Sequence, residues 1–183
     1  MAQCAGRLLT NLKLPTAVSM LGFVARPWPH RDWQLMITRP LGKKDYDHIV
    51  QVIDRWWGGP TSALAHPLFF YELGELARVV EHDGILVGFL FGFVAPGPPR
   101  TGYIHLVGIH PDYRRRGVGR ILYQTFEEEC RARDCRRLKA VTTTGNEGSL
   151  AFHRATGWEV SFVEDYAGPA RPRIVMHKVL EPV

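Results

Sequence analysis

The sequence contains too little cysteine for a fold built on disulfides or on a cysteine-ligated metal. Its three cysteines, Cys4, Cys130 and Cys135, are an odd number at spacings unlike those of zinc clips or redox pairs. Reduced thiols and a cytoplasmic location are therefore expected. The eight histidines are scattered, and none forms the pair one helical turn apart, beside a glutamate, that typically binds zinc. We therefore expect no bound metal.

Long apolar runs and extreme net charge are also missing. No apolar stretch approaches the roughly 20 residues that a membrane-spanning helix needs, so a membrane partner is not expected. The 183 residues carry a formal net charge of +5. This mild positive excess suits an anionic small ligand, or weak binding to nucleic acid or to another acidic surface.

The first 31 residues contain no acidic residue, although four basic ones occur there together with a short apolar patch at 17–25. This composition is compatible with a targeting presequence, with a disordered leader or with a start codon placed too far upstream. We expect residues 1–32 to be an extension and residues 33–183 to form one domain.

Apolar periodicity predicts seven strands and four helices. The strands are expected at 33–38, 77–82, 85–94, 101–109, 137–143, 158–164 and 174–179. The helices are expected from about residue 43 to Gly58, at 67–76, from residue 118, and from an N-cap at Asn146 to Gly157. Asp83 and Gly84 suit a tight hairpin turn. This order of elements predicts one α/β or α+β domain with a mixed sheet.

The densest cluster of positive charge in the sequence lies directly before two glycines, in the stretch HPDYRRRGVGRIL. Arg114–Arg116 lead into Gly117 and Gly119, between a predicted strand and a predicted helix. The first turn of a helix has free N–H groups, and glycine allows a phosphate close to the backbone. The usual phosphate motifs GxxxxGK[ST] and GxGxxG do not fit, since Leu122 stands where the latter needs glycine. The stretch predicts a phosphate or diphosphate site, and a solvated basic loop is the alternative.

This stretch resembles the acetyl-CoA loop of the GNAT N-acetyltransferase superfamily, whose signature is [Q/R]xxGx[G/A]. Arg114, Gly117 and Gly119 match it, and NEGSLAFHRATGW at 146–158 resembles a second family signature, NxxAxxLYxxxGF. The resemblance covers roughly residues 33–180. It implies a mixed, mostly antiparallel sheet of about seven strands flanked by helices, and acetyl-CoA or another acyl-CoA as the acyl donor.

The resemblance also implies how CoA is held. The family binds the pyrophosphate with backbone N–H groups of this loop, and pairs the pantetheine arm with its fourth strand, here Val107 to Ile109. Asn146 would contact CoA, cap its helix, or do both. The implied cofactor-binding residues are Val107, Gly108, Ile109, Arg114, Arg115, Arg116, Gly117, Val118, Gly119, Arg120 and Asn146.

Two histidines are the candidate catalytic residues. Strand alternation places Tyr103, His105, Val107 and Ile109 on one face. The position of His105 is similar to that of a histidine in arylalkylamine N-acetyltransferases, which implies a general base; a structural histidine is the alternative.

His153 stands where the family usually has tyrosine. It could protonate the departing thiolate, or it could be a bystander, with Tyr166 or water supplying the proton.

The leading function is an N-acetyltransferase that moves an acetyl group from acetyl-CoA to a primary amine by direct attack in a ternary complex. The alternatives are a catalytically silent acyl-CoA-binding or sensing domain, and a nucleic-acid binder that uses Arg114–Arg116 and the basic residues at 131–139. The nucleic-acid hypothesis lacks a recognisable module. The acceptor is left open among small amines, antibiotics, peptides and proteins, and a homodimer is a further expectation.

Overall fold

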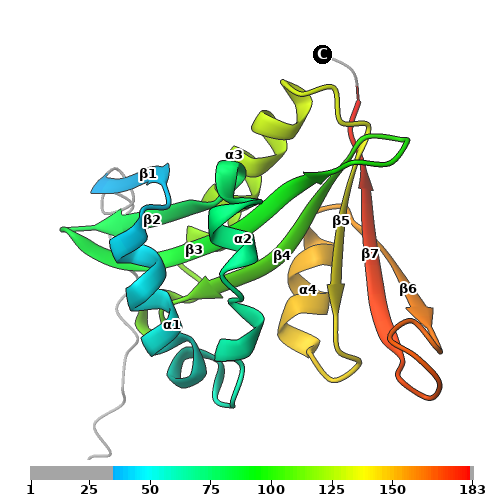
Figure 1. Cartoon of the computed structure of the whole chain (residues 1–183), viewed down its shortest axis with the longest axis horizontal. Helices are drawn as coiled ribbons and strands as arrows, with labels where there is room; N and C mark the ends of the chain where they lie inside the picture. The colour runs from blue at the N-terminus through cyan, green and yellow to red at the C-terminus, as the bar shows by residue number, and fades with distance from the viewer. Residues whose placement is uncertain (1–34, 182–183) are drawn as a thin grey trace, which may run out of the picture.

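A computed structural model describes residues 35–181, and it shows a seven-stranded sheet with helices on both faces (Figure 1). The predicted extension at 1–32 and the first two residues of the first predicted strand lie outside the described residues. The predicted mixed, mostly antiparallel sheet is confirmed. The strands are β1 (Met36–Pro40), β2 (Arg78–His82), β3 (Ile85–Ala95), β4 (Thr101–Ile109), β5 (Arg137–Thr142), β6 (Glu159–Val163) and β7 (Arg173–Val179).

Four α-helices connect these strands, together with three short 3₁₀ segments. The helix predicted at 67–76 is interrupted, because α-helical pairing ends with the C-cap Glu72 and Gly74, a poor helix former, begins a 3₁₀ turn. The helices are α1 (Lys43–Trp57), α2 (Leu68–Tyr71), α3 (Val118–Arg131) and α4 (Glu147–Ala155). The 3₁₀ segments are η2 (Ser62–Leu64), η3 (Gly74–Leu76) and η4 (Pro111–Tyr113).

The strands lie in the order β1-β2-β3-β4-β5-β7-β6. All neighbours are antiparallel except β4 and β5, which are parallel because α3 carries the chain back across the sheet between them. The predicted hairpin turn between β2 and β3 is present, with positive φ angles of 51° at Asp83 and 74° at Gly84.

Two hydrophobic cores lie on opposite faces of the sheet. The α1–α2 core consists of Leu41, Tyr46, Ile49, Val52, Ile53, Trp56, Ala65, Ala77, Val79, Leu86, Phe89, Phe91 and Leu106. The α3–α4 core consists of Leu76, Val80, Val87, Leu90, Ile104, Val118, Leu122, Tyr123, Phe126, Cys130, Cys135, Leu138, Ala140, Leu150, Trp158, Ile174, Met176 and Leu180. The first core draws only on strands β2–β4, so α1 and α2 cover half of their face of the sheet.

Glycines in the central strands let α3 approach the sheet closely. A Cβ atom at Gly92 would overlap the ring of Phe126, and one at Gly102 would overlap the Sγ atom of Cys130. Both partners are fully buried in the α3–α4 core, where neighbouring side chains leave them little freedom to move. The position of α3, and hence of the loop before it, therefore depends on these glycines.

We expect Gly92→Ala to destabilise the fold by about 1–3 kcal/mol, because the added methyl overpacks the core against Phe126. Urea unfolding of the parent and the variant measures this change. Gly97→Ala is the matched control, since a Cβ at Gly97 meets nothing within 4 Å. Equal stabilities of the Gly92→Ala variant and the parent would contradict this account of helix packing.

Candidate functional site

The central strands β4 and β5 separate halfway along β4. They pair over four residue pairs, from Thr101 with Arg137 to Ile104 with Ala140. Beyond Ile104, β4 stays paired with β3 and β5 stays paired with β7. Within the described residues, the edge of β4 that faces β5 therefore has no strand partner from His105 to Ile109, and Figure 1 shows the two strands spreading apart there. Such an edge can pair with an extended, amide-containing ligand.

A β-bulge lies where the strands begin to separate. Phe91 pairs with Leu106 and Gly92 pairs with Ile104, so His105 is the extra residue of β4. Ile104 packs in the α3–α4 core, whereas Leu106, two residues later, packs in the α1–α2 core. The bulge therefore exchanges the two faces of the strand.

This exchange corrects the predicted arrangement of side chains on β4. Tyr103 and His105 lie on the face of α2, where His105 stacks on Phe69. Val107 and Ile109 instead pack against the α3–α4 core. The prediction that all four side chains share one face is wrong, because it assumed unbroken alternation.

His105 is half-buried and held by two contacts. Its ring stacks on Phe69 with centroids 3.6 Å apart, and its Nε2 atom lies 2.9 Å from the carbonyl oxygen of Leu64. Because a carbonyl oxygen only accepts, this hydrogen bond places a proton on Nε2 and leaves the lone pair on Nδ1 of the neutral ring. Burial lowers the pKa of His105, although the hydrogen bond to Leu64 opposes that shift. The ring is therefore neutral near pH 7.

The segment that carries Leu64 is itself fixed to α1. One carboxylate oxygen of Asp54 accepts hydrogen bonds from the backbone N–H groups of Thr61 and Ser62, each at 2.6 Å. The carboxylate thus holds the turn that positions the Leu64 carbonyl, and through it the ring of His105.

The loop before α3 has the backbone shape of an anion site. Arg115 and Gly117 have positive φ angles of 61° and 85°, and Gly117 is the N-cap of α3 without a side-chain cap. Left-handed residues in such a turn direct successive N–H groups toward one concavity. The first N–H groups of α3, from Val118 to Arg120, add the unpaired donors of a helix N-terminus. Val118 itself is buried, so only its backbone can contribute.

The loop arginines have different positions. The guanidinium of Arg114 donates to the backbone carbonyl of Trp56 in the last turn of α1, so this side chain ties the loop to α1. Arg116 lies over the ring of Tyr113, 5.0 Å from its centroid. Arg115 and Arg120 are exposed. The sequence did not suggest the Arg114–Trp56 contact, since the two residues are far apart along the chain.

Asn146 connects β5 to α4. Its Oδ1 atom accepts from the backbone N–H of Ser149 at 3.1 Å, and its Nδ2 atom donates to the hydroxyl of Thr142 at 3.0 Å. The predicted capping role is confirmed, and the contact with CoA stays a prediction. Gly108 packs against Phe89, whose ring would overlap a Cβ at this position.

A surface cavity of about 310 Å³ lies between α3 and α4, close to the first turn of α3. Its lining combines two cations, a carboxylate and aromatic rings. The residues are Arg120, Tyr123, Gln124, Glu127, Phe152, Ala155, Thr156, Trp158 and Lys178.

His153 is buried and both of its ring nitrogens are hydrogen-bonded. Nδ1 donates to the backbone carbonyl of Ser149 at 2.7 Å, so Nε2 accepts from the hydroxyl of Tyr123 at 3.0 Å. Tyr123, Phe152 and Trp158 surround the ring edge to face. Burial lowers the pKa of His153, which leaves a neutral ring with no proton directed at a ligand. This arrangement favours a structural role for His153, and the general-acid role stays a hypothesis.

The family model for the acetyltransferase (GNAT) family matches residues 33–158. This chain belongs to that family. An acetyltransferase of Yersinia pestis (strain Pestoides F) is 29% identical over 85 residues, which are 46% of this chain and 58% of that protein. The match to this relative thus spans little more than half of its length. The family match confirms the prediction of a GNAT N-acetyltransferase.

Solved structures show the same fold. Ard1 from Thermoplasma volcanium superposes with a TM-score of 0.68 and 20% identity, covering 80% of this chain and 99% of that one. The acetyltransferase yncA from Salmonella typhimurium, solved with its cofactor acetyl-CoA, gives a TM-score of 0.61 and 17% identity over 80% of this chain and 95% of its own.

The GNAT domain shows two further features in its described part. No group of three or more His, Cys, Asp or Glu side chains within residues 35–181 is arranged to hold a metal ion. None of the helices in the same range combines the length and apolar character needed to cross a bilayer.

Aromatic residues of α1 and α2 divide between core and surface. Trp56 is buried in the α1–α2 core and Phe69 covers His105, whereas Trp57 and Tyr71 are exposed. Trp56 is thus a core residue, and Phe69 is the ring that reaches the candidate site of this GNAT domain.

We expect His153→Ala to act on stability. Loss of two buried hydrogen bonds and of ring volume should lower the free energy of unfolding by about 2–4 kcal/mol. The turnover rate of the folded variant should change by less than about tenfold, below the usual range for a lost general acid. Urea unfolding and steady-state kinetics measure the two effects. A stable variant with turnover reduced a hundredfold would support the acid hypothesis.

Proposed function

We propose that this protein transfers an acetyl group from acetyl-CoA to a primary amine by direct attack in a ternary complex. The observation that carries the proposal is the position of the anion-binding loop at the N-terminus of α3, directly after β4. Among the described residues, the edge of β4 that faces β5 has no strand partner from His105 to Ile109. The phosphate site directly follows the free backbone edge along the chain. This arrangement suits a ligand in which a diphosphate is joined to an amide-rich arm.

The residues present fit CoA in three places. The N–H groups of Arg115–Arg120 would hold the pyrophosphate, and the free edge of β4 would pair with the amides of the pantetheine arm. The cavity that begins at Arg120 and ends at Lys178 would take the nucleotide end. Acetyl-CoA supplies the activated acyl group as a thioester.

His105 would remove the proton from the attacking amine. It is the first residue of β4 beyond the pairing with β5, at the point where the arm would reach the acceptor face. Its Nε2 proton is engaged by Leu64, which fixes the tautomer and leaves Nδ1 as the basic atom. A neutral imidazole near pH 7 can accept the proton that the amine must lose.

No acid is needed for the departing sulfur in this proposal. A thiol has a pKa near 8.5, so a thiolate leaves readily and water can protonate it. Tyr166 stays an alternative donor, although the ammonium of Lys139 lies over its ring.

A catalytically silent acyl-CoA-binding domain is the second candidate. The missing family tyrosine supports this candidate, since His153 in its place is buried and both of its ring nitrogens are hydrogen-bonded. Release of free thiol from acetyl-CoA with a panel of primary amines separates the two functions. The cytoplasmic location and the homodimer stay predictions.

CoA should bind through the first turn of α3. We expect CoA to raise the melting temperature of the parent, because a ligand of the native state stabilises it. Gly119→Glu should weaken CoA binding at least about tenfold, since it places a carboxylate where phosphate is expected.

Gly119→Ala is the matched control for that variant. Its Cβ would lie 3.6 Å from the ring of Phe152, an ordinary contact, so CoA affinity should be retained. Calorimetry or thermal-shift titration measures all three proteins. Equal affinity of the Gly119→Glu variant and the parent would place the pyrophosphate elsewhere.

The base role of His105 predicts a pH-dependent loss of activity. We expect His105→Ala to lower kcat/KM by about 10²-fold or more near pH 7. The loss should shrink above pH 9, where more of the acceptor amine is already neutral. In the parent, the contribution of His105 should disappear only at a pH below the ordinary titration range of histidine, because burial lowers the pKa of the ring and protonation then removes the base.

His105→Gln distinguishes the base from a structural role, since its amide can still donate to the Leu64 carbonyl but cannot accept the proton. We expect the His105→Gln variant to have a kcat/KM as low as that of His105→Ala. The control His48→Ala, which changes an exposed histidine on α1, should keep the parental pH–rate profile. A His105→Gln variant with the parental pH–rate profile would refute the assignment.

A further inference from the structure

A row of side chains crosses four strands on the open half of the sheet. Tyr103 of β4 pairs with Lys139 of β5, Lys139 pairs with His177 of β7, and His177 pairs with Glu159 of β6. The residues next to them along the strands pack in or against the α3–α4 core, namely Leu138, Ala140, Val160 and Met176. The row therefore faces the other side of the sheet. Within the described residues, the α1–α2 core on that side includes no residue of β5, β6 or β7, so α1 and α2 do not cover the row, whose Tyr103, Lys139 and His177 side chains are half-buried.

Lys139 differs from the other cations on this face. Arg137 donates to the hydroxyl of Thr101, and Arg173 donates to the carbonyl of Pro172. The ammonium of Lys139 lies 5.2 Å from the centroid of the Tyr166 ring and, within residues 35–181, forms no ion pair. A contact with a ring face leaves N–H donors available for an anion.

The surroundings of Lys139 are electropositive. Burial lowers the pKa of the neighbouring His177, and the charges of Arg137 and Lys139 lower it further. The Nδ1 atom of His177 is buried without a hydrogen-bond partner. The acid of the row, Glu159, lies at its far end, two strands from Lys139.

This cation lies close to the proposed base. Lys139 of β5 pairs with Tyr103 of β4, and Tyr103 precedes His105 by two residues on β4. With strands about 4.8 Å apart and a rise of about 3.3 Å per residue, the backbones of Lys139 and His105 are about 8 Å apart.

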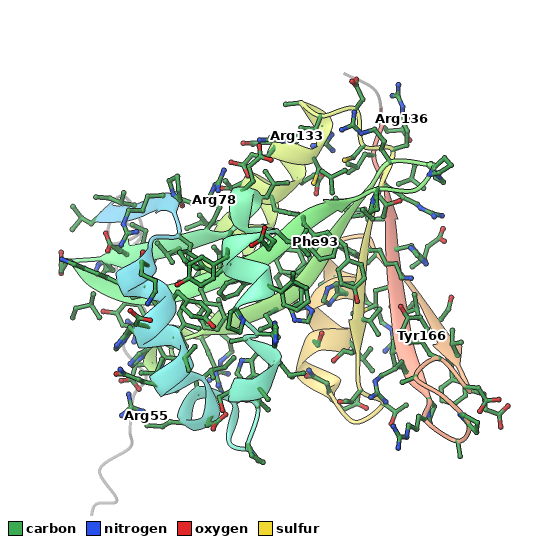
Figure 2. All side chains as sticks on the ribbon, viewed as in Figure 1. Arg55, Arg78, Phe93, Arg133, Arg136 and Tyr166 are labelled. Carbon is green, nitrogen blue, oxygen red and sulfur yellow. The ribbon has the colours of Figure 1, made fainter. Side chains whose placement is uncertain are left out.

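Rings join the two positions on the same face. His105 stacks on Phe69 and Phe69 stacks on Phe93, whose ring packs at a tilt against that of Tyr103; Tyr166 lies close enough to Tyr103 to raise the pKa of its hydroxyl, together with burial. Figure 2 places Phe93 near the centre of the sheet and Tyr166 beside β7. An acceptor with its amine at His105 would therefore extend over this face toward Lys139.

We infer that the acceptor carries an anionic group several bonds away from its reacting amine, and that Lys139 binds this group. The inference rests on the proposed acetyl transfer and names the class of acceptor for the same site. A carboxylate and a phosphate share the required chemistry, because each accepts charge-assisted hydrogen bonds from an ammonium group.

Matched acceptors test the inference with acetyl-CoA as donor. One pair is ε-aminocaproate and its methyl ester, and the other is aminopropyl phosphate and aminopropanol. The parent should show a higher kcat/KM for the anionic member of at least one pair, and the pair that responds identifies the anion. Lys139→Met should lower the ratio of anionic to neutral kcat/KM about tenfold, and Lys139→Arg should retain it.

Lys44→Met is the matched control, since it removes one exposed lysine of α1 and should leave the ratio unchanged. Unchanged thermal stability and CoA affinity of the Lys139→Met variant would show that the ratio reports acceptor binding. Acetylation of both members of each pair at equal rates, or an equal loss for both in Lys139→Met, would overturn the inference and leave the proposed function standing. No acetylation of any amine would remove both.

Discussion

The arrangement of the candidate site depends on the early end of the pairing between β4 and β5. Backbone N–H and C=O groups need partners, and an edge that loses its neighbouring strand in the middle of a sheet is unusual. Here β4 keeps β3 on one edge while its other edge is free from His105 onward. A ligand with its own amide groups can restore the missing pairing, which explains why a CoA-like arm suits this position better than a purely aromatic or charged ligand.

Two local features place chemistry at this opening. The bulge at His105 turns that ring toward α2 while Val107 and Ile109 face α3, so one strand would serve both the proposed acceptor side and the proposed CoA side. Arg114 then joins the loop before α3 to the carbonyl end of α1. Because α1 also holds the Leu64 segment through Asp54, the anion loop and the proposed base are tied to the same helix.

Much of this fold follows from periodicity and turn chemistry. The strand at 101–109 was predicted to the residue, and Asn146, Gly58 and the Asp83–Gly84 turn have their expected roles. The anion loop was also predictable, because glycine spacing and a helix start are local signals.

Other features depend on contacts between distant residues. The bulge at His105 arises from the register with β3, so alternation along β4 alone gave the wrong face for Val107 and Ile109. The position of His153 could not be read from its motif, because its partners Tyr123 and Trp158 come from other elements. In the sequence, Lys139 was only one member of the basic cluster at 131–139, because its position beside the candidate site depends on which side of β5 lacks a helix.

Hydrogen–deuterium exchange with and without CoA tests most directly whether a ligand completes the edge of β4. The account predicts slower exchange in two segments together, 105–109 of β4 and 115–120 at the start of α3, with little change in β1 and β2. Protection of the α3 segment without β4 would show that CoA binds by its phosphates and that the arm does not enter between the strands. Protection confined to other elements would contradict the site altogether.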